Sequence, residues 1–372
     1  MQRLVSYRSE FPILERKVYL NSCSLGALPR AGMAAVQAFL DEWAMDGAAA
    51  WERWLKKLTR LREFYAKLLG VTPPEIAIVP SVSGALSAIA SCLDYRARPR
   101  VVSSDLDFPT LLYQWQAKAP AVQLVRAATP DGVRIPLEEY EQLIDDRTAL
   151  VAVSHVLYSS HWLQDISALA RMAHARGAYL LVDVYHSAGV VPVDLIAMGA
   201  DFAVGGSLKW LCGGPGTAFL YVRRDLVQAL FPTVTGWLAH ADPFAFSTEL
   251  DYAPDAARFH SGSPAVGSIY AAHAGLEIIL EAGVAAIRDR VADLTDYLTA
   301  ECLDRGWILR SPLDRAERGG AVFIQSDRPA ALAQRLLEDG IVVDARGPCL
   351  RVSPHFYNTP GDLEALVNSL AQ

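Results

Sequence analysis

Two side chains that can do covalent and acid–base chemistry stand in the glycine-rich stretch Ala178–Gly216. Asp183 ends a continuous apolar segment, where an ionised carboxylate is costly unless it has a partner. Lys209 follows a second apolar segment and a pair of glycines that let the backbone turn tightly around it. Their separation, 209 − 183 = 26 residues, corresponds to about one βαβ unit, so we expect both at the same edge of a sheet.

An amine and a carboxylate in this arrangement suit the cofactor pyridoxal 5'-phosphate (PLP). A lysine can hold the cofactor as a Schiff base, and an aspartate keeps the pyridine nitrogen protonated, so that the ring accepts electrons from a carbanion. The simpler alternative, a helix-capping aspartate and a surface lysine, explains either residue alone. It does not explain why both follow apolar strands and why glycines flank the lysine, so we predict a PLP site at Lys209 and Asp183.

The same stretch resembles a known family. Asp183 and His186 form a D-x-x-H motif, and the segment GGSLKWLCGGPG follows at residues 205–216. Both resemble the corresponding motifs of the class V aminotransferases. This family of fold-type I PLP-dependent enzymes includes kynureninases and cysteine desulfurases. The resemblance extends over nearly the whole chain. It implies an α/β fold of type I, with a mainly parallel seven-stranded sheet and a smaller α+β domain. It also implies a homodimer whose active sites are shared between the two subunits.

A second motif predicts where the phosphate of the cofactor binds. Residues 80–86 follow an apolar strand and open a helix, whose N-terminal amides and dipole suit an anion. The alternative is a plain serine N-cap. In the family's phosphate-binding turn, the matching positions of this chain are Val82, through its amide, and Ser83. The resemblance implies that the other cofactor-binding residues are Phe108, Tyr158, Asp183, His186, Ser207, Lys209, Trp237 and Ser263.

Three of these positions have a stated role in the family. Phe108, in an F-P-T setting, matches an aromatic residue that stacks on the ring, and a core residue is the alternative. His186 matches a histidine that contacts the ring hydroxyl or the aspartate. It acts either as a catalytic group or as a residue that only holds those groups in position. Ser263 stands where a threonine binds the phosphate of the neighbouring subunit. We take Lys209, Asp183 and His186 as the candidate catalytic residues and expect no metal ligands.

The block at residues 343–358 concerns the substrate. It is similar to the kynureninase signature D-x-R-x-P, R-V-x-P, Y-N, which implies that Arg351 forms a bidentate pair with the α-carboxylate of the substrate. Arg351 stands between apolar residues, which disfavours a surface arginine. Near the other end of the chain, residues 19–26 resemble the turn that touches the same carboxylate, here through Asn21 and Ser24.

The reaction stays open between several alternatives. A lyase that cleaves at the β-carbon of an L-amino acid is favoured by the Arg351 block and by Gly236–His240, which resembles a kynureninase G-W-x-x-H segment. Ser263 in place of a substrate-selecting asparagine, and Leu208 in place of a phosphate-binding tyrosine, argue against kynureninase itself. A C–S lyase, an aminotransferase and an epimerase remain alternatives, because Lys209 can shuttle a proton without help from a further residue.

Two other functions fit less well. A cysteine desulfurase needs a thiolate on a mobile loop, whereas the local cysteine, Cys349, falls inside a predicted strand next to Arg351. A non-catalytic protein of the same fold would lack a cofactor residue, whereas Asp183, Lys209 and the phosphate turn are all present. The predicted activity is therefore that of a PLP-dependent lyase or aminotransferase.

The elements that must position these residues alternate between short apolar strands and helices, which predicts a mainly parallel sheet covered on both faces. Residues 31–69 have helical spacing, and Gly70 closes them. We expect an N-terminal segment at 1–30 that packs on a small domain at 259–372, and a large PLP-binding domain at 31–258. The predicted strands are 76–79, 101–102, 149–153, 179–182, 202–204 and 218–222, followed by 321–324, 341–343 and 350–352 in the small domain.

The composition is that of a folded enzyme and argues against several classes of protein. Hydrophobic residues make up 52% and charged residues 20%, which disfavours disorder. The net charge of −7, without a cluster of Lys and Arg, argues against nucleic acid as a partner. The five scattered cysteines, without a CxxC pair, argue against disulfides and zinc. With no signal sequence and no apolar run long enough to span a bilayer, we expect a cytoplasmic protein that binds an amino-acid substrate and no membrane.

Overall fold

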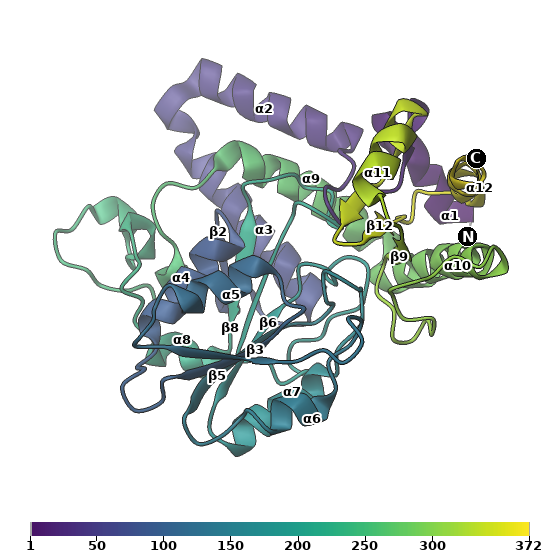
Figure 1. Cartoon of the computed structure of the whole chain (residues 1–372). Helices are drawn as coiled ribbons and strands as arrows, with labels where there is room; N and C mark the ends of the chain where they lie inside the picture. Colours follow the sequence, from purple (N-terminus) through teal and green to yellow (C-terminus); the bar gives the residue numbers. More distant parts are fainter. Residues whose placement is uncertain (1, 372) are drawn as a thin grey trace.

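A seven-stranded sheet, in the order β2-β8-β7-β6-β5-β3-β4, forms the centre of the computed structural model, which describes residues 2–371 (Figure 1). The pairs from β4 through β7 are parallel, and β8 runs antiparallel to both β7 and β2. The predicted mainly parallel sheet is therefore confirmed. The strands are β2 (Ile76–Val79), β3 (Arg100–Ser104), β4 (Gln123–Ala127), β5 (Thr148–Ser154), β6 (Tyr179–Asp183), β7 (Phe202–Gly206) and β8 (Ala218–Val222).

Helices cover both faces of this sheet, which is why its inner strands are apolar throughout. Alternate strand residues belong to two separate cores: Val151 and Val182 face one, whereas Leu150 and Leu181 face the other. The first core includes α3 (Trp51–Leu69), α7 (Ile166–Ala175) and α9 (Val266–Ala282). The second includes α4 (Val82–Cys92), α5 (Pro109–Gln116) and α8 (Arg224–Ala229). The short helix α6 (Leu137–Glu141) lies near α7.

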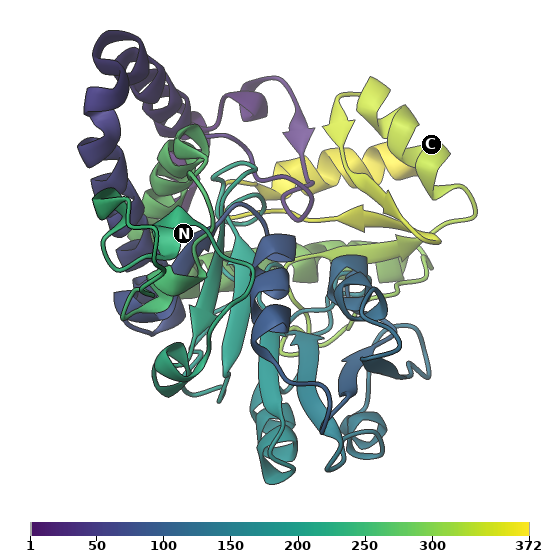
Figure 2. The same ribbon diagram turned by 90° about the vertical axis from the view of Figure 1, so that its left-hand side faces the viewer.

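The helical stretch predicted at 31–69 is two helices. Helix α2 (Arg30–Asp46) ends at Gly47, which has φ +53°, and α3 follows after one 3₁₀ turn. Helix α3 ends at Gly70 in the left-handed conformation, as predicted. Helix α2 packs on α9 along the edge of the molecule (Figures 1 and 2). The 3₁₀ turns are Ser6–Glu10, Pro12–Glu15, Gly47–Ala50, Pro73–Glu75, Trp237–Ala239, Pro243–Ala245 and Ala256–Phe259.

The C-terminal part has its own apolar core and a three-stranded antiparallel sheet in the order β11-β12-β9. The N-terminal strand β1 (Val18–Tyr19) pairs with β10 in parallel, so the start of the chain packs on this part (Figure 2). The domain boundaries at residues 30 and 258 stay predictions. The elements here are α10 (Val284–Asp304), β9 (Val322–Gln325), α11 (Pro329–Glu338), β10 (Ile341–Val342), β11 (Asp344–Arg346), β12 (Cys349–Val352) and α12 (Pro360–Leu370), beside α1 (Gln2–Val5).

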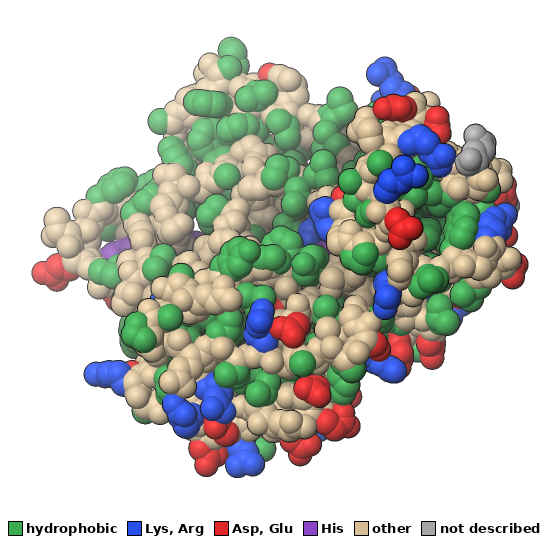
Figure 3. Space-filling model, viewed as in Figure 1, with side chains coloured by type: hydrophobic (Ala, Val, Ile, Leu, Met, Phe, Trp, Pro, Cys, Tyr) green, Lys and Arg blue, Asp and Glu red, His purple; other side chains and the backbone are tan. Residues whose placement is uncertain are grey.

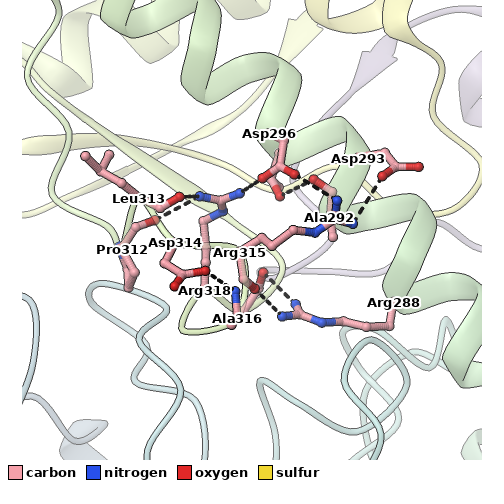
Figure 4. A network of polar contacts seen from close by, with 12 residues as sticks. Arg288, Ala292, Asp293, Asp296, Pro312, Leu313, Asp314, Arg315, Ala316 and Arg318 are labelled. Atoms are coloured by element: carbon pink, nitrogen blue, oxygen red, sulfur yellow. Dashed lines mark hydrogen bonds and ion pairs between the residues drawn. The ribbon is translucent and has the colours of Figure 1, made fainter.

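A buried arginine connects α10 to the segment before β9 (Figure 4). The Nη1 of Arg318 donates to the carbonyls of Pro312 and Leu313, at 2.9 and 2.8 Å, and its other nitrogen contacts Asp296 on α10. Because this guanidinium is fully buried, its charge needs these partners. The segment before β9 also contacts the connection between β5 and α7, where the amide of Leu163 donates to the carbonyl oxygen of Glu317 at 2.8 Å.

Two further features concern the cysteines and the length of the apolar helices. All five cysteines are unpaired. Within residues 2–371, no single helix is long and apolar enough to cross a membrane. Helices α9 and α10 reach that length and composition only when they are counted together, and they are bent by 81°.

Candidate active site

A cavity of about 300 Å³ opens beyond the carboxyl ends of β6 and β7, where ligands of parallel sheets are expected. It is bounded by the first turn of α4, the residues after β3, and the turn that follows β7. Six of the predicted residues line this cavity together: Val82, Ser83, Phe108, Asp183, His186 and Lys209.

The amine of Lys209 is held at the centre of the polar groups in this cavity. Its Nζ lies 2.7 Å from Nε2 of His186. The same Nζ lies 4.6 Å from the ring centroid of Tyr185 and 5.6 Å from that of Phe108. Burial lowers the pKa of Lys209 to about 8, although the carboxylate of Asp183 opposes this shift. The amine is therefore partly neutral near physiological pH, which makes it a nucleophile.

The carboxylate of Asp183 is buried and strongly influenced by its surroundings. Burial raises its pKa to about 6, whereas the amide of Tyr185, which donates to Oδ1 at 2.8 Å, and the charge of Lys209 both lower it. A second buried carboxylate, that of Asp107, also raises the pKa of Asp183. A carboxylate in this setting is well placed to bind a protonated ring nitrogen.

Asp107 itself joins the ends of β3 and β5. Its carboxylate accepts hydrogen bonds from Ser103 Oγ, from the amide and hydroxyl of Ser104, and from the amide of Ser154, at 2.7 to 3.0 Å. Because Phe108 follows Asp107 directly, these bonds fix the position of the aromatic ring. The sequence pattern did not single out Asp107.

The N-terminus of α4 contains both a serine N-cap and the predicted phosphate ligands. Ser81 is the N-cap, and its Oγ accepts the amide of Gly84 at 3.2 Å, so the capping alternative is correct for this residue. The first amides of a helix have no partner within the helix, and the cap uses that of Gly84. Val82 and Ser83 line the cavity beside it and remain the predicted phosphate ligands.

The turn that carries Lys209 is packed tightly on both sides. A Cβ added at Gly26 would lie 2.0 Å from the carbonyl oxygen of Lys209. The amide of Gly26 donates a hydrogen bond to the carbonyl oxygen of Leu208 at 2.8 Å. A Cβ at Gly213 would lie 2.6 Å from the Cα of Ala272 in α9. Ser207 donates its hydroxyl to the carbonyls of Gly214 and Thr217, and its predicted contact with the cofactor stays a prediction.

Three other predicted cofactor residues lie outside the lining of the cavity. Tyr158 packs edge-on against Phe108, with centroids 5.2 Å apart. Ser263 lines a smaller neighbouring cavity together with Gly216 and Thr217. Trp237 packs against Trp51 and an exposed aromatic loop. Within one chain, neither Ser263 nor Trp237 lines the cavity of Lys209. The role of Ser263 toward the neighbouring subunit and the role of Trp237 in lining the site both stay predictions.

The predicted carboxylate-binding residues gather at β12. Arg351 is buried there, and its Nη2 donates to Oδ2 of Asp344 at 2.7 Å. Asp344 also accepts from Arg346 at 3.0 Å, so one carboxylate is shared by two guanidinium groups. The backbone of Asn21 forms a parallel β-bridge with Ser353, which lies two residues after Arg351. The backbone amide of Ser24 donates to the carbonyl oxygen of Asn21 at 3.0 Å. The predicted binding roles of Asn21, Ser24 and Arg351 stay predictions.

Two aromatic side chains at the site were not predicted. Tyr185 lines the cavity, and its position between Asp183 and His186 is a signal that the sequence offers. His161 packs edge-on against His186 with centroids 5.0 Å apart. No local pattern marks His161, because it reaches the site only through the tertiary fold.

Comparison with known proteins gives this geometry a context. The family model described as aminotransferase class-V matches residues 18–366. The chain belongs to the aminotransferase class-V family. The uncharacterized aminotransferase YcbU of Bacillus subtilis (strain 168) is 37% identical over 98% of this chain and 96% of its own length. A kynureninase of Deinococcus radiodurans is 36% identical over 99% of this chain and 92% of its own length.

Solved structures share the fold. A mutant of the cystine C–S lyase C-DES, with glycine covalently linked to its PLP cofactor, superposes with a TM-score of 0.90 at 20% identity. The superposition covers 98% of this chain and 99% of that one. The type I fold predicted from the sequence is thereby confirmed.

This member of the family is a PLP-dependent enzyme, and the residues of its cavity fit the cofactor. The fit rests on the buried carboxylate of Asp183, the low pKa of Lys209 and the helix N-terminus at Val82 and Ser83. Bound PLP supplies an aldehyde carbon and an electron-withdrawing ring. Asp183 would hold the ring nitrogen, the first turn of α4 the phosphate, and Lys209 the aldehyde carbon.

Proposed function

We propose that this enzyme is a lyase that acts on an L-amino acid and cleaves at its β-carbon, as a kynureninase-like enzyme or a C–S lyase. The observation that carries this proposal is the likeness to a kynureninase, which spans 99% of this chain at 36% identity. The buried Arg351 at the edge of the site supports a substrate with a carboxylate.

The described side chains divide the work of such a reaction. Arg351 binds and orients the α-carboxylate, and Lys209 removes and returns the proton at the Cα atom of the substrate. Asp183 stabilises positive charge on the ring nitrogen, and His186 stands within hydrogen-bond distance of the lysine nitrogen. The aromatic side chains of Phe108 and Tyr185 flank the amine of Lys209.

The structure disfavours a cysteine desulfurase of the type that needs a mobile thiol. Cys349 is buried in β12, where its backbone pairs with both β11 and β9. Burial also raises its pKa, which opposes formation of a thiolate. A C–S lyase does not need this cysteine and remains within the proposal.

An aminotransferase is the second candidate, because a protein that carries this description is 37% identical to the chain. Mass spectrometry of the products from a panel of L-amino acids, including kynurenine and cysteine, with and without a 2-oxo acid, separates the two. Alanine or pyruvate formed without the 2-oxo acid supports a lyase. Product formed only with the 2-oxo acid shows an aminotransferase and contradicts the proposal.

We also propose a homodimer with shared active sites. Large apolar side chains are exposed along α2, where Trp43 is 59% and Met45 83% exposed. Figure 3 shows hydrophobic side chains gathered over the part of the surface formed by α2 and α9. A second copy that covered this face would remove it from water. Trp43→Glu should shift the protein from dimer toward monomer in sedimentation velocity, whereas an unchanged sedimentation coefficient would place the interface elsewhere.

The proposed location is the cytoplasm. The five unpaired cysteines agree with a reducing compartment. We further propose that neither nucleic acid nor a membrane is a partner. The support is a net charge of −7, which does not favour attraction to phosphates.

A further inference from the structure

His161 has a backbone conformation that non-glycine residues rarely adopt. It lies in the connection between β5 and α7 with φ +58°, and its side chain is fully buried. A left-handed conformation at such a residue costs energy and persists only where the surroundings enforce it. A glycine would adopt this conformation without strain, so the imidazole must have a use that offsets the strain.

The hydrogen bonds of His161 determine which of its nitrogens carries the proton. Its Nδ1 accepts a hydrogen bond from the amide of Gly320 at 3.2 Å, so the lone pair of this nitrogen is engaged and the nitrogen carries no proton. Burial holds the pKa of His161 well below its usual value, so the ring is neutral. The single proton consequently lies on Nε2. This N–H is buried and, among the described residues, has no hydrogen-bond partner.

The ring of His161 packs against His186, which has a matching unpaired atom. The two rings meet edge to face at 82°, with centroids 5.0 Å apart. The Nδ1 of His186 is buried and likewise has no partner among the described residues. The Nε2 of His186 faces Nζ of Lys209 at 2.7 Å. A buried unpaired N–H on one ring beside a buried unpaired nitrogen on the other is costly for both, which favours a hydrogen bond between them.

We propose that His161 is a positioning residue that sets the tautomer of His186, so that His186 directs its Nε2 proton to the nitrogen of Lys209. All donors then point one way: from the amide of Gly320 to His161, from His161 to His186, and from His186 to Lys209. A proton donated to Lys209 stabilises the neutral amine, which has the lone pair that a nucleophile needs.

Burial above all, and the positive charges nearby in addition, lower the pKa of both histidines and keep them neutral, as the proposed tautomers require. Lys209 and Arg351 disfavour protonation of both rings, and Arg346 disfavours that of His186. For Lys209 itself, burial is the largest effect and lowers the pKa, Asp183 and Cys23 raise it, and Arg351 and Arg346 lower it further. The remaining ring contacts of His161 are with Trp210 and Phe323, which carry no charge.

The first amide of the chain of donors belongs to the C-terminal part of the protein. Gly319 donates its amide to the carbonyl of His161 at 2.7 Å, and a Cβ at Gly320 would lie 2.6 Å from the ring of Trp210. These glycines follow Arg318, whose buried contacts with α10 hold the segment in place. The ionisation of Lys209 is thereby coupled to a segment that lies more than 100 residues away along the chain.

The test is ¹⁵N NMR of the histidine rings in the full-length protein. In the wild type we expect Nδ1 without a proton and Nε2 with one, for both His161 and His186. A proton on Nδ1 of His186 would overturn the proposal, and this measurement needs no variant and no knowledge of the reaction catalysed. It therefore separates a failure of this inference from a failure of the proposed function.

A variant then tests the consequence for Lys209. In His161→Phe, His186 loses its tautomer preference, and the apparent pKa of Lys209 should rise by about one unit, the order of one net hydrogen bond. The readout is the pH dependence of PLP attachment to Lys209, trapped by borohydride and quantified by intact mass. The matched control is His273→Phe in α9, which replaces an imidazole that packs on Phe64 of α3.

His161→Gly separates the effect of losing the imidazole N–H from the effect of relieving the backbone strain. Glycine removes the strain together with the imidazole, so the melting temperature and the pKa of Lys209 should respond independently. The same rise in pKa as in His161→Phe supports the tautomer role. A pKa of Lys209 unchanged in both variants shows that His161 only fills space and overturns the proposal.

Discussion

Replacing Arg351 by alanine should weaken binding of the amino-acid substrate far more than it slows the chemical step. Arg351 is buried, its Nε has no partner among the described residues, and only one of its nitrogens is used by Asp344, at 2.7 Å. A hydrogen bond to a charged group contributes about 1.5–3 kcal/mol. At 1.36 kcal/mol for a factor of ten, KM should therefore rise by about 10- to 150-fold.

The assay is steady-state kinetics with the amino acid that the product screen identifies. Arg351→Lys keeps the charge but loses the planar fork, so it should recover only part of the affinity. Arg346→Gln is the matched control, because Arg346 shares Asp344 but is 42% exposed as a side chain. An unchanged KM in Arg351→Ala, in a protein that still melts cooperatively, would remove Arg351 from the substrate site and refute the reasoning.

Three further predictions concern the lysine, the thiol and the pH dependence of stability. Lys209→Ala should abolish turnover and the covalent attachment of PLP seen by intact mass after reduction, and retained turnover would refute its catalytic role. Cys349→Ala should leave lyase activity within about twofold of wild type, because the thiol is buried in a strand; a complete loss would favour desulfurase chemistry. His155, His260 and His355 have pKa values lowered by burial to about 4, against 6.5 ordinarily, so the unfolded chain binds more protons between these values. The free energy of unfolding should therefore fall as the pH is lowered from about 6.5 toward 4, and a melting temperature that rises over this range would contradict it.

Most of the fold could be predicted because its inner strands are apolar on both faces. Strands β5, β6, β7 and β8 are short apolar runs that the sequence displays directly. The edge strand β4 was not predicted, since it is only partly buried and its two adjacent apolar residues are too short a run to stand out. The polar strand β11 was missed for the same reason, although it carries Asp344. The break at Gly47 was also missed, because apolar spacing continues across it.

The predicted roles of Lys209 and Asp183, and their meeting at one site, followed from the sequence itself. Each residue stands at the end of its own strand, and the carboxyl ends of parallel strands meet at one edge, so local spacing is sufficient to bring them together. The predicted phosphate-binding position of Ser83 follows from the same rule, since a strand leads directly into the helix that positions it.

Only the tertiary structure decided which groups tune these residues. The pairing of Arg351 with Asp344, the bonds that tie Asp107 to Ser154, and the contact of His161 with His186 join different strands and loops. No spacing rule connects such positions, because their distance is set by how the helices and the small sheet pack. The sequence by itself therefore determined which groups are candidates for the chemistry, whereas packing decided how burial and neighbouring charges shift their pKa values.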